Sequence, residues 1–391
     1  MYILAVNISH HCSICLLKDG DIVFFQEEDR FSRNKHHYTH CILESLWSKD
    51  PGFNTIKNDI ELKTIQSLPK ELKKIDHIIF CTTGLSSDSY VMNIILDQIR
   101  STIEIENIHH YPEHHLYHAC SAFYNSGFDT ALSLVLDGGG FNNHHEETQN
   151  LCDMKFHEQE TVFVLDYNNI RSLLRHYSLS DFKFYKYNNF KNTRSYHERN
   201  KMFSASWGCG GIFNLISLIL GFGNEAGKTM GLAAYGNADN VKENWFVLDE
   251  KNDLWITDNN AILKSFASRF DLPENLNYLH QVTYIAKVDE KIGADLAKKA
   301  QQETLNRTIK LIEKYSQESG EKNVVLSGGY FLNCSNNYEY LKRFPNLNFF
   351  IDPIAHDGGT ALGAAKYLWH KLTGDTTKRR LETLYLGLQN D

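Results

Sequence analysis

The sequence predicts an α/β fold with two similar subdomains. Residues 2–28 and residues 130–180 carry this prediction, because each stretch combines apolar strands with a turn and a polar or glycine-rich loop. A unit that recurs within one chain indicates an internal duplication. The composition agrees, since 391 residues with 42% hydrophobic and 23% charged side chains suffice for two globular domains with their own cores.

Three short strands open the chain. They are expected at residues 2–7, 13–18 and 21–28, and Asp19-Gly20 predicts a hairpin turn between the last two. Strand, polar loop, strand, turn and strand is the opening of an actin-like ATPase domain, in which loop 7–13 would lie near a phosphate. We therefore expect a duplicated actin-like ATPase fold, with a central cleft between its two subdomains.

The predicted boundary between the subdomains follows the first long helix. The first subdomain is expected at residues 1–125 and the second at residues 126–391. Polar stretches at about 141–200 and 237–290 are interpreted as insertions in the second subdomain, and the latter is expected to be irregular. Residues 348–369 predict a strand, a loop and a helix of small residues, and this C-terminal helix is expected to return to the first subdomain.

The stretch 113–140 holds the residues with the clearest chemistry. His114 and His118 stand at positions i and i+4 of a predicted helix, so both rings project from one face. A buried strand follows, and Asp137 with the glycines of loop 138–140 lies at its carboxyl end, where α/β sheets place ligands. A competing interpretation is an ordinary helix with two histidines, because a chain with 19 histidines contains about one such pair by chance.

A second carboxylate follows another predicted strand. Asp357 lies in the loop of the 348–369 stretch, directly before two glycines. It is therefore a natural partner for the histidine pair. Two histidines with one or two carboxylates and open coordination positions suit Fe(II) better than structural zinc.

A charge-dense stretch, EEDRFSRNKHH at 27–37, has two interpretations. It is either a solvated loop or helix start, or a set of cations gathered for a phosphorylated ligand, namely Arg30, Arg33 and Lys35.

Two glycine-rich stretches follow later in the chain. Residues 323–333 predict a strand, a glycine turn and a helix start, which is the arrangement of an anion or nucleotide site. Residues 223–236 are not a Walker loop, because Phe222 stands where the motif needs a glycine. A plain helix cap and turn is the simpler interpretation of that stretch.

Composition and charge exclude several classes of protein. The net charge is −8 without a basic block, so a nucleic-acid backbone is not an obvious partner. The eight cysteines are scattered, which favours the reducing cytoplasm over a disulfide scaffold. No apolar run has membrane-spanning length, and Met1 leads directly into a strand, so neither a membrane partner nor a signal peptide is expected.

Six motifs together resemble one family. They are NISHHCSICLLKDG, EEDRFSRNKH, HHLYHACSAFYNSGFDTALSLVLDGGG, GKTMGLAAYG, LSGGYFLN and AHDGGTALGAA, with LYLG near the end. Their order and their spread over nearly all 391 residues resemble the O-carbamoyltransferases of the nodulation-protein and tobramycin-carbamoylating type. The N-terminal part of that family is similar to the universal tRNA threonylcarbamoyl-transfer protein, which has an actin-like fold.

The resemblance implies a two-stage reaction in biosynthesis. Carbamoyl phosphate and ATP give carbamoyl-adenylate, and the carbamoyl group then passes to a hydroxyl of a small-molecule, sugar or nucleotide acceptor. It also implies Fe(II) or another divalent metal as cofactor. The roles implied for this chain are His10 as catalytic residue; His114, His118, Asp137 and Asp357 as metal ligands; Lys35, Gly138, Gly139, Gly328, Gly329 and Asn333 as nucleotide-binding residues; and Glu225 as acceptor-binding residue.

The chain departs from the family pattern in two places. The family usually has His-Asp where this chain has His10-His11, so the missing carboxylate changes how His10 is oriented or lets His11 share its work. Family members also continue past LYLG into a small nucleotide-binding domain that makes the adenylate. We therefore expect an excerpt of a longer protein, a transfer module that a separate adenylate-forming protein supplies, or a different activation step. Pyrophosphate release from ATP and carbamoyl phosphate by the chain alone would contradict the second expectation.

Three other functions fit parts of the pattern. A tRNA threonylcarbamoyl transferase shares the fold and the histidine pair, but the acidic net charge argues against it. An actin-like small-molecule kinase would need an aspartate aimed at a γ-phosphate and no metal-binding histidines. A binding subunit without catalytic activity would not need all four expected metal ligands.

Overall fold

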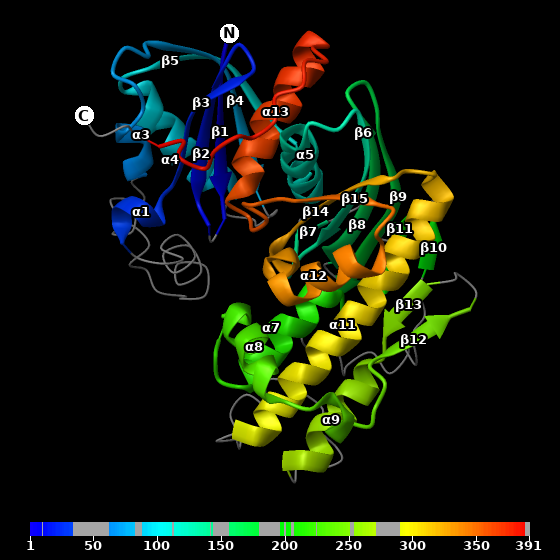
Figure 1. Cartoon of the computed structure of the whole chain (residues 1–391). Coiled ribbons are helices and arrows are strands. Elements are labelled where there is room, and N and C mark those ends of the chain that lie inside the picture. The colour runs from blue at the N-terminus through cyan, green and yellow to red at the C-terminus, as the bar shows by residue number, and fades with distance from the viewer. Residues whose placement is uncertain are drawn as a thin grey trace.

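The computed structural model contains two mixed β-sheets, with helices between and around them (Figure 1). It describes residues 1–9, 11–33, 62–82, 88–111, 113–140, 142–143, 156–179, 196–198, 201–204, 207–223, 225–250, 254–270 and 290–387. Within these ranges, none of the helices has the length and apolar character needed to cross a membrane.

The first sheet has the strand order β3-β2-β1-β4-β5. Its strands are β1 (Tyr2–Ile8), β2 (Ser13–Lys18), β3 (Asp21–Glu27), β4 (Lys74–Thr82) and β5 (Glu104–His110). β1 pairs antiparallel with β2 and parallel with β4, while β5 is parallel to β4. Asp19 and Gly20 have φ angles of 51° and 88°, which is the conformation that the predicted Asp-Gly hairpin turn needs.

The second sheet has the strand order β10-β11-β9-β8-β6-β14-β15, with β7 (Asn142–Asn143) beside β8. Its other strands are β6 (Thr130–Leu136), β8 (Phe156–Asp166), β9 (Ile170–Leu179), β10 (Tyr196–Glu198), β11 (Lys201–Ser204), β14 (Asn323–Ser327) and β15 (Asn348–Ile351). β6 pairs antiparallel with β8 and parallel with β14. The run β9-β8-β6-β14-β15 therefore has the strand order and directions of the whole first sheet.

Helices cover both sheets. Those before the second sheet are α1 (Asp29–Ser32), α3 (Lys63–Gln66), α4 (Asp88–Arg100) and α5 (His114–Ser126). Those after β11 are α7 (Cys209–Ile219), α8 (Ala226–Leu232), η3 (Ala233–Tyr235), η4 (Ala238–Asn240), α9 (Asn259–Phe270), α11 (Glu290–Ser319), η5 (Gly329–Leu332), α12 (Cys334–Arg343) and α13 (Gly359–Thr373). The predicted long helix is α11, and Gly320 ends it in the left-handed conformation.

The stretch at about 237–290 is more regular than its sequence predicts. It contains the hairpin β12 (Phe246–Asp249) and β13 (Leu254–Thr257), followed by α9. Trp245, Ile256 and Phe266 are buried in the same core as α7 and α11. The expectation of irregular structure is wrong for these elements, because a few widely spaced apolar residues anchor them to a core built elsewhere in the chain.

Each half of the chain contributes one helix that packs on the sheet of the other half. α5 follows the first sheet but packs on the second, where Phe123 shares a core with Val135 of β6 and Val325 of β14. α13 follows the second sheet but packs on the first, where Leu362 shares a core with Ala5 of β1. The two helices also pack on each other between the sheets (Figure 1). The domain boundary at residue 125 stays a prediction.

Candidate metal centre between the two sheets

The histidine pair lies in the first two turns of α5. Gly127 ends this helix with a φ of 77°, as the sequence predicts. His114 and His118 are completely buried, although histidine is only moderately common inside proteins. Asp137 follows β6 and is 6% exposed, and Asp357 precedes α13 and is 3% exposed. Buried ionisable groups of this kind need partners.

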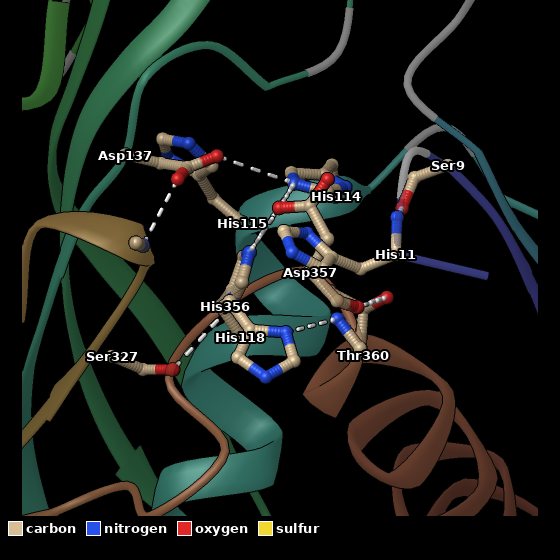
Figure 2. A network of polar contacts seen from close by, with 12 residues as sticks. Ser9, His11, His114, His115, His118, Asp137, Ser327, His356, Asp357 and Thr360 are labelled. Atoms are coloured by element: carbon tan, nitrogen blue, oxygen red, sulfur yellow. Dashed lines mark hydrogen bonds and ion pairs between the residues drawn. The ribbon is translucent and has the colours of Figure 1, made fainter. Parts of the chain in front are cut away.

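The four side chains point toward one another (Figure 2). The Nε2 atoms of His114 and His118 are 3.2 Å apart. Nε2 of His114 lies 3.6 Å from Oδ2 of Asp137 and 3.6 Å from Oδ1 of Asp357, and Nε2 of His118 lies 3.6 Å from the same Asp357 oxygen. One ligand atom from each residue fits within 4.8 Å of all the others. The structure thus brings together all four residues that the resemblance implies as metal ligands.

The donor set fits a divalent metal. Separations of 3.6 Å are too long for good N–H···O bonds, but they suit ligand atoms that surround one ion at about 2.1 Å each. Side-chain atoms that point away from the centre of the cluster have partners of their own, as the outer atoms of metal ligands usually do. Oδ1 of Asp137 accepts a hydrogen bond from Gly329 N (3.0 Å), and Nδ1 of His118 lies 3.4 Å from Ser327 Oγ. Two imidazoles with two carboxylates are ligands that Fe(II), Mn(II) and Zn(II) accept.

The electrostatics of the cluster favour a bound positive charge. Burial alone would lower the pKa of His114, but the Asp357 and Asp137 carboxylates outweigh burial and raise this pKa to about 10. Burial and the neighbouring Asp357 would raise the pKa of Asp137, yet His114 and His118 hold it below its usual range. Two buried carboxylates are therefore stabilised by positive charge between them, which a proton or a metal ion supplies.

The loop that carries Asp357 is tied to the first sheet. Nδ2 of Asn7, at the end of β1, donates hydrogen bonds to Asp357 O (2.9 Å), His11 O (2.8 Å) and Ser9 Oγ (3.0 Å). Thr360, in the first turn of α13, donates to the same Asp357 carbonyl through N and Oγ1. Asn7, at the start of the predicted phosphate loop, thus joins that loop to the loop that carries Asp357.

The glycines predicted to bind a nucleotide lie on adjacent strand ends. β6 and β14 are parallel neighbours, so the turn with Gly138 and Gly139 and the turn with Gly328 and Gly329 meet at one edge of the second sheet. Gly328 has a φ of 97°, and a Cβ there would collide with the Leu136 carbonyl, so only glycine fits.

Asn333 caps the helix that follows the second turn. Its side chain accepts a hydrogen bond from Asn336 N at 3.2 Å, at the start of α12. The structure thus gives Asn333 a structural partner. The nucleotide role of Asn333 and of the four glycines stays a prediction.

The other predicted site residues are less clearly placed. His10 and Lys35 lie outside the described residues. Arg30 is exposed on α1 and pairs with Glu27 at 3.5 Å. Glu225 stands before α8 and its carbonyl accepts a hydrogen bond from Lys228 N at 2.9 Å. The acceptor-binding role of Glu225 therefore stays a prediction as well.

A second histidine contact, which the sequence does not predict, lies beside the cluster. The ring of His356 lies 4.5 Å from the ring of His11, and its Nε2 lies 3.2 Å from Oε1 of Glu27. Gly358 N donates to Nδ1 of His356 at 3.1 Å, which leaves the proton on Nε2 to face Glu27. The position of His356 directly before Asp357 indicates that it lies near the cluster, whereas nothing in the sequence indicates that His356 contacts Glu27.

A buried polar network supports the first turn of α5. Arg175 of β9 donates to Oε2 of Glu113 (2.8 Å), the residue before His114, and its Nη1 lies 3.5 Å from Glu158 of β8. His115 Nδ1 lies 2.8 Å from Oγ1 of Thr161, also on β8. Arg175 therefore fixes the start of α5 to the second sheet.

Replacing Arg175 by methionine is expected to weaken metal binding by up to about tenfold, the lower end of the effect of removing a group that bonds a ligand directly, because Arg175 hydrogen-bonds the neighbour of His114 rather than a ligand itself. The reason is that Glu113 and His114 lose their fixed position relative to Asp137. Calorimetric titration with Mn(II) measures the affinity. Arg171→Met, an exposed arginine on the same strand, is the control and should bind as the wild type does. Equal affinities of the two variants would show that Arg175 does not position the cluster.

Comparison with known proteins places the chain in a family. Residues 89–366 match the family model described as carbamoyltransferase N-terminus. The chain belongs to the carbamoyltransferase N-terminus family. This family is one of transferase enzymes, and the matched range contains all four residues of the cluster.

Sequence similarity to other proteins extends over nearly the whole chain. An uncharacterised protein of Synechocystis is 26% identical over 99% of this chain and 60% of its own length. The nodulation protein NolNO of Sinorhizobium fredii is 24% identical over 97% of this chain and 49% of its own length. The chain thus spans about half to three fifths of these relatives.

Among solved structures, full-length HypF in its phosphate- and nucleotide-bound form has the same fold over 96% of this chain and 56% of its own. Its TM-score is 0.52 and its sequence identity is 14%.

Proposed function

We propose that this chain carries the transfer site of an O-carbamoyltransferase. In this proposal a carbamoyl group passes from carbamoyl-adenylate, derived from carbamoyl phosphate and ATP, to a hydroxyl of a small-molecule, sugar or nucleotide acceptor. The observation that carries the proposal is the buried cluster of two histidines and two aspartates, drawn from both halves of the chain. The family assignment and the likeness to nodulation proteins NolNO and NolO support it.

The arrangement of the sheets supports a duplicated actin-like ATPase fold as its frame. Five strands repeat in order and direction, and the last helix of each half packs on the other sheet. Carboxyl ends of parallel strands in such sheets are where ligands bind. We infer that carbamoyl-adenylate binds along the glycine turns at 138–139 and 328–329, with Asn333 beside it. A nucleotide is bound in HypF, which shares the fold.

The cluster residues would hold a divalent ion, and Fe(II) is the first candidate. When bound, such an ion acts as a Lewis acid that stabilises negative charge on the acyl group under attack. His114, His118, Asp137 and Asp357 supply its ligands, and Gly329 N fixes the orientation of Asp137. We further propose that His10 removes the proton from the acceptor hydroxyl, that Glu225 binds the acceptor, and that Lys35 binds the donor phosphate.

A transfer assay tests this function. The purified chain, loaded with Fe(II) under anaerobic conditions, is given carbamoyl-adenylate made by a separate activating domain together with a panel of sugars, nucleosides and other alcohols. Mass spectrometry should show the gain of one carbamoyl group on one acceptor class, and removal of the metal by EDTA should stop it. Transfer that continues in EDTA would contradict the role of the cluster. In a parallel assay with ATP in place of carbamoyl-adenylate, formation of ADP together with a phosphorylated sugar would instead indicate a kinase.

A further inference from the structure

A cavity lies beside α11, between this helix and the β12–β13 hairpin. Its volume is about 570 Å³. It is lined by residues of α11, of the β12–β13 hairpin and of α12, among them Phe246, Trp255, Asn306, Arg307, Lys310 and Arg343. None of the four cluster residues lines this cavity, so it is distinct from the metal centre.

The charge of the cavity wall is positive among the described residues. The wall contains Arg307, Lys310, Arg343 and Glu303. Their ion-pair partners are Glu160 for Arg307, Glu313 for both Lys310 and Arg343, and Lys299 for Glu303. Counted together with these partners, the group contains four cations and three carboxylates. One negative charge on a ligand would neutralise the remaining positive charge.

Arg307 has hydrogen-bonding capacity that the described protein atoms do not use. It is 2% exposed, its Nε donates to Trp255 O at 2.8 Å and its Nη1 donates to Glu160 Oε1 at 2.5 Å. Its Nη2 is buried without a hydrogen-bond partner among the described residues. The Arg307 side chain has no exposed surface, so its guanidinium lies behind the cavity wall and adds positive charge to it without touching the cavity.

Aromatic and aliphatic side chains form the rest of the wall. Trp255 is 36% exposed. The guanidinium carbon of Arg307 lies over the ring of Phe246, 5.4 Å from the ring centre. Ile309 adds an apolar surface on α11. A cavity with flat apolar walls and a few convergent cations selects a ligand with a flat apolar body and an anionic group.

We propose that this cavity is a small-molecule site, which binds an aromatic carboxylate with its ring beside Trp255 and its carboxylate between Lys310 and Arg343, in front of the buried Arg307. This proposal does not depend on the transfer reaction. The ligand would join α11 to the β12–β13 hairpin. Behind this wall Arg307 pairs with Glu160 of β8, the strand whose Thr161 lies beside His115 of α5.

Benzoate is the probe for the test, used on the full chain in the presence of EDTA so that the metal centre does not take part. We expect a saturable change in tryptophan fluorescence and a rise in the unfolding temperature, because a ligand that binds the native state stabilises it. Benzamide, which has the same shape without the charge, should bind at least about tenfold more weakly.

Variants locate the binding. The double variant Lys310→Met/Arg343→Met should weaken benzoate binding about tenfold, while Lys322→Met, an exposed lysine outside the cavity, should bind as the wild type does. Trp255→Phe should lose the fluorescence change but keep binding in calorimetry. No saturable binding of benzoate, equal binding of benzamide, or unchanged affinity of the double variant would each overturn the proposal.

Discussion

Replacing His118 by alanine is expected to remove divalent-metal binding and carbamoyl transfer together. His118 supplies one of four ligand atoms that lie within 4.8 Å of one another, and its loss leaves Asp137 and Asp357 with one imidazole. Loss of a supporting group alone costs about 10- to 100-fold in metal affinity, so loss of a ligand should cost at least about 100-fold. Transfer should fall by at least about the same factor, because one removed electrostatic donor in an active site costs about 100- to 1000-fold in rate.

The measurement combines two readouts on one preparation. Metal content after anaerobic loading with Fe(II) is determined by mass spectrometry, and transfer is followed with carbamoyl-adenylate and the best acceptor. His109→Ala is the matched control, because this histidine lies on the edge strand β5 and its ring contacts His77 and Tyr111 rather than the cluster. The control should keep metal and activity. A His118→Ala variant that loses transfer but keeps its metal would show that His118 is not a metal ligand and has another role in transfer.

That the four residues of the cluster lie together could be predicted, because each follows a local rule. The i, i+4 spacing of His114 and His118 is visible in the sequence, and both aspartates stand directly after or near the carboxyl end of an apolar strand. The strands β1, β2, β3 and β6 could be predicted for the same reason. Their apolar residues are continuous or alternate, and a turn or loop follows each of them. The structure places them within a residue or two of the prediction.

Elements that depend on distant partners could not be predicted. β5 has the sequence EIENIHH, in which most side chains are polar and exposed, and it is a strand because β4 offers its edge. The β12–β13 hairpin and α9 were missed because their few buried residues pack on α7 and α11. Likewise, Glu27 meets His356 only because α13 returns to the first sheet, a contact over more than three hundred residues that no local pattern records.

Replacing Gly363 by alanine is expected to destabilise the protein, although it adds only one methyl group. Gly363 lies in the second turn of α13, where this helix crosses α5. A Cβ there would lie 2.7 Å from Ser121 N and would overlap the Tyr117 carbonyl oxygen. Alanine favours an exposed helix over glycine by about 1 kcal/mol, but overpacking between two rigid backbones costs about 1–3 kcal/mol and more where neither can move. We expect a net loss of about 2 kcal/mol in the free energy of unfolding.

Gly231→Ala is the matched control, because Gly231 lies in α8 and a Cβ there meets nothing within 4 Å. It should leave the unfolding midpoint in urea unchanged or raise it slightly, while Gly363→Ala should lower it. Metal affinity is the second readout. Tyr117 is adjacent to His118 and Asp357 lies just before α13, so helices forced apart at Gly363 also separate the ligands that they carry. Lower stability with unchanged Mn(II) affinity would show that the loops hold the cluster, whereas a joint loss would show that the crossing of α5 and α13 sets its geometry.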